Sequence, residues 1–105
     1  MAEKIYNKLV RDRIPEIIQN HKKTCETTQV AGQELQSLLN QKLQEEVEEF
    51  LQSGDLEELA DILEVIHGIL QYRGTTFKEL EVIRLKKKEE RGGFEKGIKL
   101  IKVKE

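Results

Sequence analysis

The stretch that decides the fold is QEEVEEFLQSGDLEELAD, residues 44–61, in which two acidic segments flank a short break at Ser53, Gly54 and Asp55. Two carboxylate pairs with three-residue spacing lie on either side of the break: Glu46 with Glu49, and Glu58 with Asp61. Residues three apart on a helix share a face. If the break is a tight turn, the second helix folds back on the first and the four carboxylates converge. Such a group repels itself unless a cation lies among its members.

Composition limits what kind of protein surrounds this stretch. The chain has 105 residues, enough for one domain with a modest core. Charged residues make up 36% and aromatic residues 5%, a profile that favours amphipathic helices over a β-sandwich or barrel. The formal net charge of −2 and the lack of a long apolar run argue against bulk binding to nucleic acid or a membrane. We expect a cytoplasmic protein.

The pattern of apolar residues and caps predicts a mainly all-α protein, an antiparallel helical bundle. Helices are predicted over about 15–21 and 32–52, from a cap at 55 to about 72, and from a cap at 76 to about 91. Two further segments, 23–30 and 97–104, lack helical periodicity and are predicted to be short strands. One domain, residues 1–105, contains them all.

Glu46 occupies an unusual position on the second predicted helix. Leu35, Leu39, Leu43 and Phe50 make one apolar stripe on that helix, and at about 100° per residue Glu46 falls in its middle. Burying an unpaired carboxylate costs roughly several kcal/mol, out of a folding free energy of only about 5–15 kcal/mol. A glutamate here therefore indicates a cationic partner. Glu45 and Glu48 lie further round, as on an ordinary solvated face.

The third predicted helix has a wide apolar arc, from Leu56 to Leu70, which suits the centre of a bundle or a subunit interface. Glu58 lies inside this arc and Asp61 on its edge. Glu58 has a structural alternative, because Asp55 and Glu58 have the spacing of a capping box. The sequence leaves both interpretations of Glu58 open.

The chemistry of the donors points to a hard metal ion. Glu49 and Glu58 lie five and four residues from Gly54, and Glu46 and Asp61 lie eight and seven residues from it. In an antiparallel hairpin these become matching levels. Carboxylates without histidine or cysteine favour Mg²⁺, Mn²⁺ or Ca²⁺ over zinc, and a site with few protein ligands favours Mg²⁺, with Mn²⁺ as a substitute.

Cationic residues occur where a polyphosphate would need them. On the fourth predicted helix the apolar stripe of Phe77 and Leu80 continues as Arg84, Lys87 and Arg91, and Lys8 and Arg11 precede the first helix. Metal together with arginine and lysine is a common way to hold phosphates. The alternatives are that these long side chains extend to water or neutralise the acidic cluster.

Several blocks of the sequence resemble one family. The pattern Glu45-Glu46-Val47-Glu48-Glu49 followed by Glu58-Leu59-Ala60-Asp61 resembles the EExxE…ExxD signature of MazG-like all-α nucleoside triphosphate pyrophosphohydrolases. The blocks YNKLVRDRIPEII (6–18), KLQEEVEEF (42–50), EELADILEVI (57–66) and RLKKKEERGGFEKGI (84–98) are similar to short single-domain members, described as house-cleaning or phosphoribosyl-ATP-pyrophosphohydrolase-like proteins. The resemblance covers nearly the whole chain.

The resemblance implies an enzyme that hydrolyses a nucleoside triphosphate to the monophosphate and pyrophosphate with Mg²⁺, as a homodimer or homotetramer. It implies Mg²⁺ ligands at four positions: Glu46, Glu49, Glu58 and Asp61. A metal-bound water would attack the α-phosphorus, oriented by Glu49 or by Glu45. The candidates for the phosphates, on match plus charge, are Lys8, Arg11, Lys87 and Arg91.

Two other functions stay open at this point. The leading hypothesis is an enzyme that acts on modified or surplus nucleotides. The first alternative is an enzyme of the same class whose substrate is phosphoribosyl-ATP. The second alternative is a non-catalytic helical assembly module, in which the acidic cluster serves only to pair helices.

Overall fold

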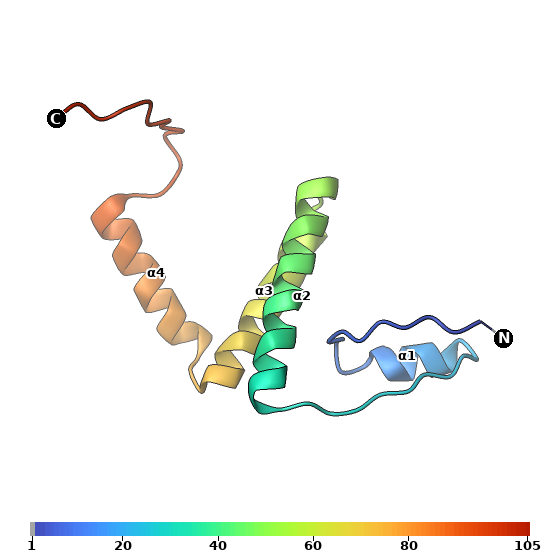
Figure 1. Cartoon of the computed structure of the whole chain (residues 1–105). Coiled ribbons are helices and arrows are strands. Elements are labelled where there is room, and N and C mark those ends of the chain that lie inside the picture. The colour runs from blue at the N-terminus through green and yellow to red at the C-terminus, as the bar shows by residue number, and fades with distance from the viewer. Residues whose placement is uncertain (1) are drawn as a thin grey trace. The chain divides into compact units, whose positions relative to one another are not determined.

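A computed structural model describes residues 2–105 and contains four helices: α1 (Ile14–Asn20), α2 (Gly32–Ser53), α3 (Leu56–Arg73) and α4 (Phe77–Arg91). Figure 1 shows them in order along the chain. The all-α prediction is confirmed, and each predicted helix lies within two residues of its observed bounds. The chain divides into two compact units, one ending at Gly74 and the other beginning at Thr75. Within the described chain, no helix has the length and apolar character needed to cross a membrane.

A glycine follows each of the two long helices, α2 and α3. Gly54 follows α2 with φ +70°, and its N–H donates to the Phe50 carbonyl over 2.8 Å. Gly74 follows α3 with φ +71°. Left-handed backbone at a helix end favours glycine, which has no Cβ to clash. The break at 53–55 is thus a tight turn, and α2 and α3 form the predicted antiparallel hairpin (Figure 1).

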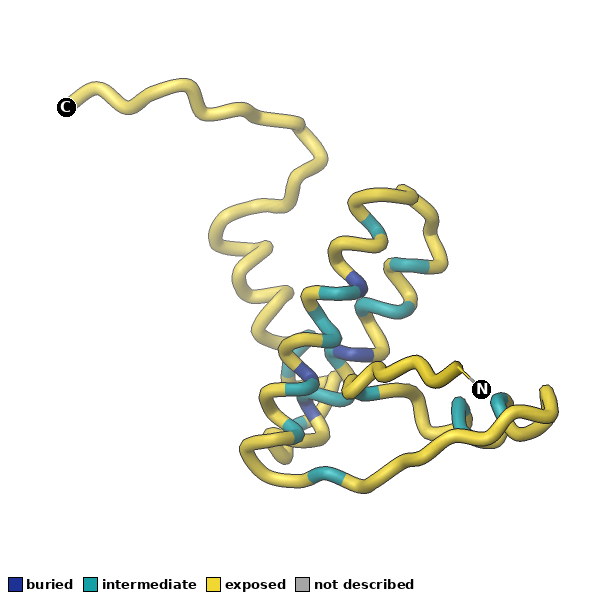
Figure 2. The backbone as a smooth tube through the Cα atoms, turned by 45° about the vertical axis from the view of Figure 1, so that its right-hand side comes forward, coloured by how far each residue is buried: buried dark blue, intermediate teal, exposed yellow. Residues whose placement is uncertain are grey.

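The core of the first unit lies between α2 and α3. Leu39 on α2 and Val65 and Leu70 on α3 are its buried apolar residues. Figure 2 shows dark blue, buried positions on both helices of the hairpin. The helices approach closely at Gly68, where an added Cβ would lie 3.1 Å from Leu39 Cδ2. The small residue at this position lets the two helices pack side by side.

Within the described residues of the first unit, the wide apolar arc of α3 is covered on one side only. Val65 and Leu70 are buried, whereas Leu56 is 80% exposed and Leu59 and Leu63 are each 43% exposed. The first unit by itself therefore does not bury α3 on two sides. A subunit interface on the exposed side stays a prediction.

The second unit contains α4 and the C-terminal tail. The Thr76 side chain accepts a hydrogen bond from the Glu79 N–H over 3.2 Å, which confirms the predicted cap. Within the second unit no α4 residue is buried, and only Leu80 and Glu81 are half-buried. Arg84 forms an ion pair with Glu81 along the same helix.

The predicted strands are also absent from residues 2–105. Segments 23–30 and 97–104 have neither helix nor strand structure. Strand propensity mostly reflects packing of side chains on a sheet, and here Ile98 and Leu100 are 82% and 75% exposed. The lack of helical periodicity in a segment does not by itself make it a strand, because a strand also needs a partner ladder.

Candidate metal centre

A pocket of about 470 Å³ lies in the first unit, beside the hairpin. Its acidic lining comes from the four residues predicted as metal ligands: Glu46, Glu49, Glu58 and Asp61. Its other lining residues come from α2 and from the N-terminal part of the chain: Lys42, Tyr6, Lys8, Val10, Arg11, Ile14 and Ile18. The hairpin therefore supplies the carboxylates and Lys42, and the N-terminal part of the chain supplies the apolar side chains, Tyr6 and two cations.

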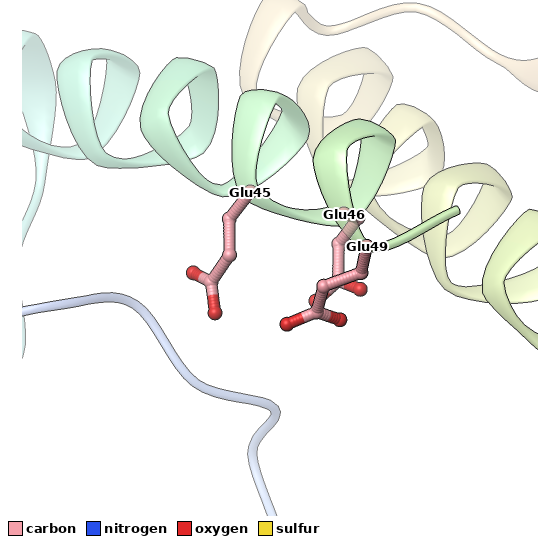
Figure 3. Close-up of side chains that lie close together, drawn as sticks. All are labelled: Glu45, Glu46 and Glu49. Atoms are coloured by element: carbon pink, nitrogen blue, oxygen red, sulfur yellow. The ribbon is translucent and has the colours of Figure 1, made fainter. Parts of the chain in front are cut away.

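The carboxylates form two overlapping clusters that share Glu46. Oxygens of Glu46, Glu58 and Asp61 lie within 4.8 Å of one another, and the same holds for Glu45, Glu46 and Glu49. The first cluster joins α2 to α3 and contains three of the four predicted ligands, whereas Glu49 belongs to the second cluster, which lies on α2 alone. Figure 3 shows the second cluster, with all three side chains leaving α2 toward the N-terminal segment. The hairpin thus brings the predicted ligands together through Glu46.

Glu46 is the most buried charged residue of the site, at 7% exposure. The Lys42 ammonium lies 3.1 Å from its Oε1. The other oxygen, Oε2, is buried and has no hydrogen-bond partner among the described residues. Burial raises the pKa of the Glu46 carboxyl, and Lys42 opposes this rise. The Lys42 ammonium therefore offsets the burial of Oε1, whereas the buried Oε2 could accept a cation in the pocket.

The structure excludes the capping-box interpretation of Glu58. In a capping box its carboxylate would accept from the Asp55 N–H, but that N–H donates to Ser53 Oγ over 3.1 Å. The Asp55 side chain makes no cap hydrogen bond either. Glu58 Oε2 is instead buried without a partner among the described residues. Burial, with repulsion from Asp61 and Glu46, raises the pKa of Glu58.

Two cations of the N-terminal segment contact the clusters directly. Lys8 Nζ lies 2.8 Å from Glu45 Oε1, and Arg11 Nη2 lies 2.7 Å from Asp61 Oδ1. The hydrogen bond from Lys8 lowers the pKa of Glu45 and raises that of Lys8. Glu45 is half-buried and forms an ion pair with Lys8. The prediction that Glu45 lies on an ordinary solvated face is therefore wrong. Long-range contacts of this kind leave no local pattern in a sequence.

Lys42 is the site residue that the sequence reasoning missed. It contacts Glu46, and its ammonium also lies 3.6 Å from Glu45 Oε2. The signal was the four-residue spacing between Lys42 and Glu46, which places them on one helix face. Five carboxylates and three cations gather at the site, so an excess of two negative formal charges remains: Glu45, Glu46, Glu49, Glu58 and Asp61 against Lys8, Arg11 and Lys42.

The remaining two phosphate candidates, Lys87 and Arg91, lie on α4 in the second unit, where both are exposed. Their assignment stays a prediction.

Comparison of the chain with family models, curated proteins and solved structures found no match.

Proposed function

We propose that this chain is a Mg²⁺-dependent nucleotide pyrophosphohydrolase that clears modified or surplus nucleotides. The observation that carries the proposal is the convergence of Glu46, Glu58 and Asp61 across the hairpin, with buried, unpartnered oxygens on Glu46 and Glu58. Buried polar atoms without a hydrogen-bond partner are rare in folded proteins, and each one calls for an explanation such as a bound ion. Three hard oxygen donors and an excess of two negative charges match a divalent cation.

The donor set fits magnesium in kind. Oxygen ligands from few side chains leave room for waters and phosphate oxygens, as Mg²⁺ prefers. Glu46, Glu58 and Asp61 would hold the ion, with Glu49 as the fourth candidate at the more exposed edge. When bound, the ion would neutralise charge on the phosphates.

The protein's own residues would then orient the reactants. Glu49 is exposed within the pocket lining and does not share the ion pair that holds Glu45 to Lys8. It is therefore the better candidate to orient a water and accept its proton as the water attacks the α-phosphorus. Pyrophosphate would leave, and Lys8 and Arg11, which line the pocket, would stabilise its charge.

The shape of the pocket also suits a nucleotide. Its volume of about 470 Å³ lies in the range typical of small-molecule sites. Val10, Ile14 and Ile18 provide an apolar part of the lining, and Tyr6 provides an aromatic ring. We assign the nucleoside to these apolar and aromatic side chains, and the phosphates to the part of the pocket between the carboxylates and the cations Lys8 and Arg11.

One observation favours the non-catalytic alternative. Lys8, Lys42 and Arg11 already pair with Glu45, Glu46 and Asp61, as expected of a cluster that only joins structural elements. The two functions differ in what the unpartnered oxygens of Glu46 and Glu58 do. Only the enzyme requires a divalent cation on them.

A nucleotide panel tests the proposal. Purified protein with Mg²⁺ is incubated with standard and modified nucleoside triphosphates and with phosphoribosyl-ATP, and pyrophosphate and orthophosphate are measured separately. We expect pyrophosphate and a monophosphate, and no product with a chelator. Release of orthophosphate would contradict attack at the α-phosphorus. No product from any substrate, together with no Mg²⁺ or Mn²⁺ binding, would favour the assembly module.

A further inference from the structure

The N-terminal segment, residues 2–13, contains no helix or strand and is joined to the hairpin by two ion pairs. Lys8 pairs with Glu45, and Arg11 pairs with Asp61. Both carboxylates belong to the clusters built around Glu46. The cations of this segment therefore bind the groups that would also bind a metal ion.

Arg11 is the sharper case because Asp61 belongs to the cluster that joins both helices. The Arg11 guanidinium lies 2.7 Å from Asp61 Oδ1. A divalent cation on that oxygen would stand next to the guanidinium and repel it. Arginine also forms strong, often bidentate, hydrogen bonds with phosphate, and Arg11 lines the pocket. It has two chemically suitable partners within one site.

We propose that Arg11 exchanges these partners: it releases Asp61 when a divalent cation binds and then holds a phosphate of the nucleotide. The segment 2–13 thereby couples metal binding to substrate binding. This inference rests on the proposed function of the same pocket. Arg11 becomes available to the phosphates only after the metal ion has displaced it from Asp61. The metal ion therefore binds before the phosphate.

The exposure of the pair makes the exchange feasible. The side chains of Arg11 and Asp61 are 54% and 38% exposed, and such pairs contribute little to stability. Removing Arg11 should therefore tighten metal binding by only about two- to fivefold. Losing a charge-assisted hydrogen bond to phosphate should weaken phosphate binding by about tenfold or more. The two effects have opposite signs.

The test compares wild type, Arg11→Gln and Arg13→Gln by isothermal titration calorimetry. Mn²⁺ alone is titrated first, and inorganic pyrophosphate as its Mg²⁺ complex second. Arg13 is a matched control, because it pairs with Glu16 of the adjoining helix and does not line the pocket. We expect Arg11→Gln to bind Mn²⁺ more tightly and pyrophosphate more weakly, and Arg13→Gln to match wild type. Circular dichroism checks that all three fold alike.

Each other outcome overturns the proposal. A parallel weakening of both ligands in Arg11→Gln would make Arg11 a structural residue only. Unchanged affinities would mean that Arg11 neither opposes the binding of the divalent cation nor holds a phosphate. If wild type binds Mn²⁺ and shows pyrophosphohydrolase activity but Arg11→Gln behaves like wild type, the exchange alone fails. If wild type binds no divalent cation, the proposed function fails with it.

Discussion

The Lys42 ammonium lies 3.1 Å from Glu46 Oε1, one helical turn away, and leaves Glu46 Oε2 buried without a partner among the described residues. Lys42 lowers the pKa of Glu46 against the effect of burial. We therefore expect Lys42→Met to raise this pKa further. Protons would then compete with metal over a wider range, and the pH at which Mn²⁺ binding is half-maximal would rise. Calorimetric titrations at several pH values measure this midpoint, with exposed Lys23→Met as the control. An unchanged or lower midpoint would contradict the role given to Lys42.

Glu46→Gln separates a metal ligand from a structural ion pair. The change keeps the shape of the side chain and removes its charge, so a buried and half-compensated carboxylate disappears. We expect thermal stability without metal to stay equal or rise, Mn²⁺ binding to fall by at least about tenfold, and activity to fall by at least about a hundredfold. Glu48→Gln, on the exposed face of the same helix, is the matched control. A clear loss of stability with unaltered metal binding would favour the assembly module.

Stability without metal should depend on pH through Glu46 and Glu58. Folding raises the pKa of both carboxyls above the ordinary value of 4.5. Such groups bind their protons more tightly in the folded protein, so their stabilising effect is present below 4.5 and is lost as the pH rises through the raised values. The variant Glu46→Gln/Glu58→Gln avoids that loss.

Urea unfolding in a chelating buffer tests this dependence. At pH 7 we expect the double variant to be more stable than wild type, with a difference that shrinks as the pH falls toward 4.5 and below. The pair Glu48→Gln/Glu57→Gln, at exposed positions, should show no such trend. A double variant that is less stable at pH 7 would mean that the two carboxylates stabilise the fold as charged groups.

Tyr6 is expected to bind the base of the nucleotide. Its ring lines the pocket and is 59% exposed, with the Lys8 ammonium 5.6 Å from the ring centroid. Stacking of a base on an aromatic side chain contributes about 1–3 kcal/mol. Tyr6→Ala should therefore raise KM by about tenfold with little change in kcat, whereas Tyr6→Phe should stay close to wild type. A fall in kcat at unchanged KM would place Tyr6 in the reaction itself.

The exposed side of α3 is expected to join two copies of the chain. Leu59 and Leu63 are each 43% exposed on a helix whose other side is packed against α2. Light scattering should show a dimer or tetramer for wild type, and Leu59→Lys/Leu63→Lys should shift it toward the monomer with unchanged helix content. Lys78→Glu on α4 is a charge-changing control. A wild-type chain that is monomeric at high concentration would exclude the predicted assembly.

Local patterns were sufficient for the helices. Gly54, Gly74 and Thr76 mark helix ends because a left-handed residue or a capping hydroxyl acts on neighbouring backbone groups. The position of Glu46 within an apolar stripe was likewise readable, since helical periodicity alone places it toward the core. The strands over 23–30 and 97–104 were wrong because a strand needs a partner that the local pattern cannot specify.

The sequence by itself determined the four helices, the tight turn and the matching levels of the acidic pairs. Each depends on interactions between residues a few positions apart. Only the tertiary structure decided that Glu58 is a pocket residue rather than a cap, and that Arg11 and Lys8 contact Asp61 and Glu45 across 50 and 37 residues of chain. Those contacts depend on how the N-terminal segment packs on the hairpin, which no spacing along the chain records.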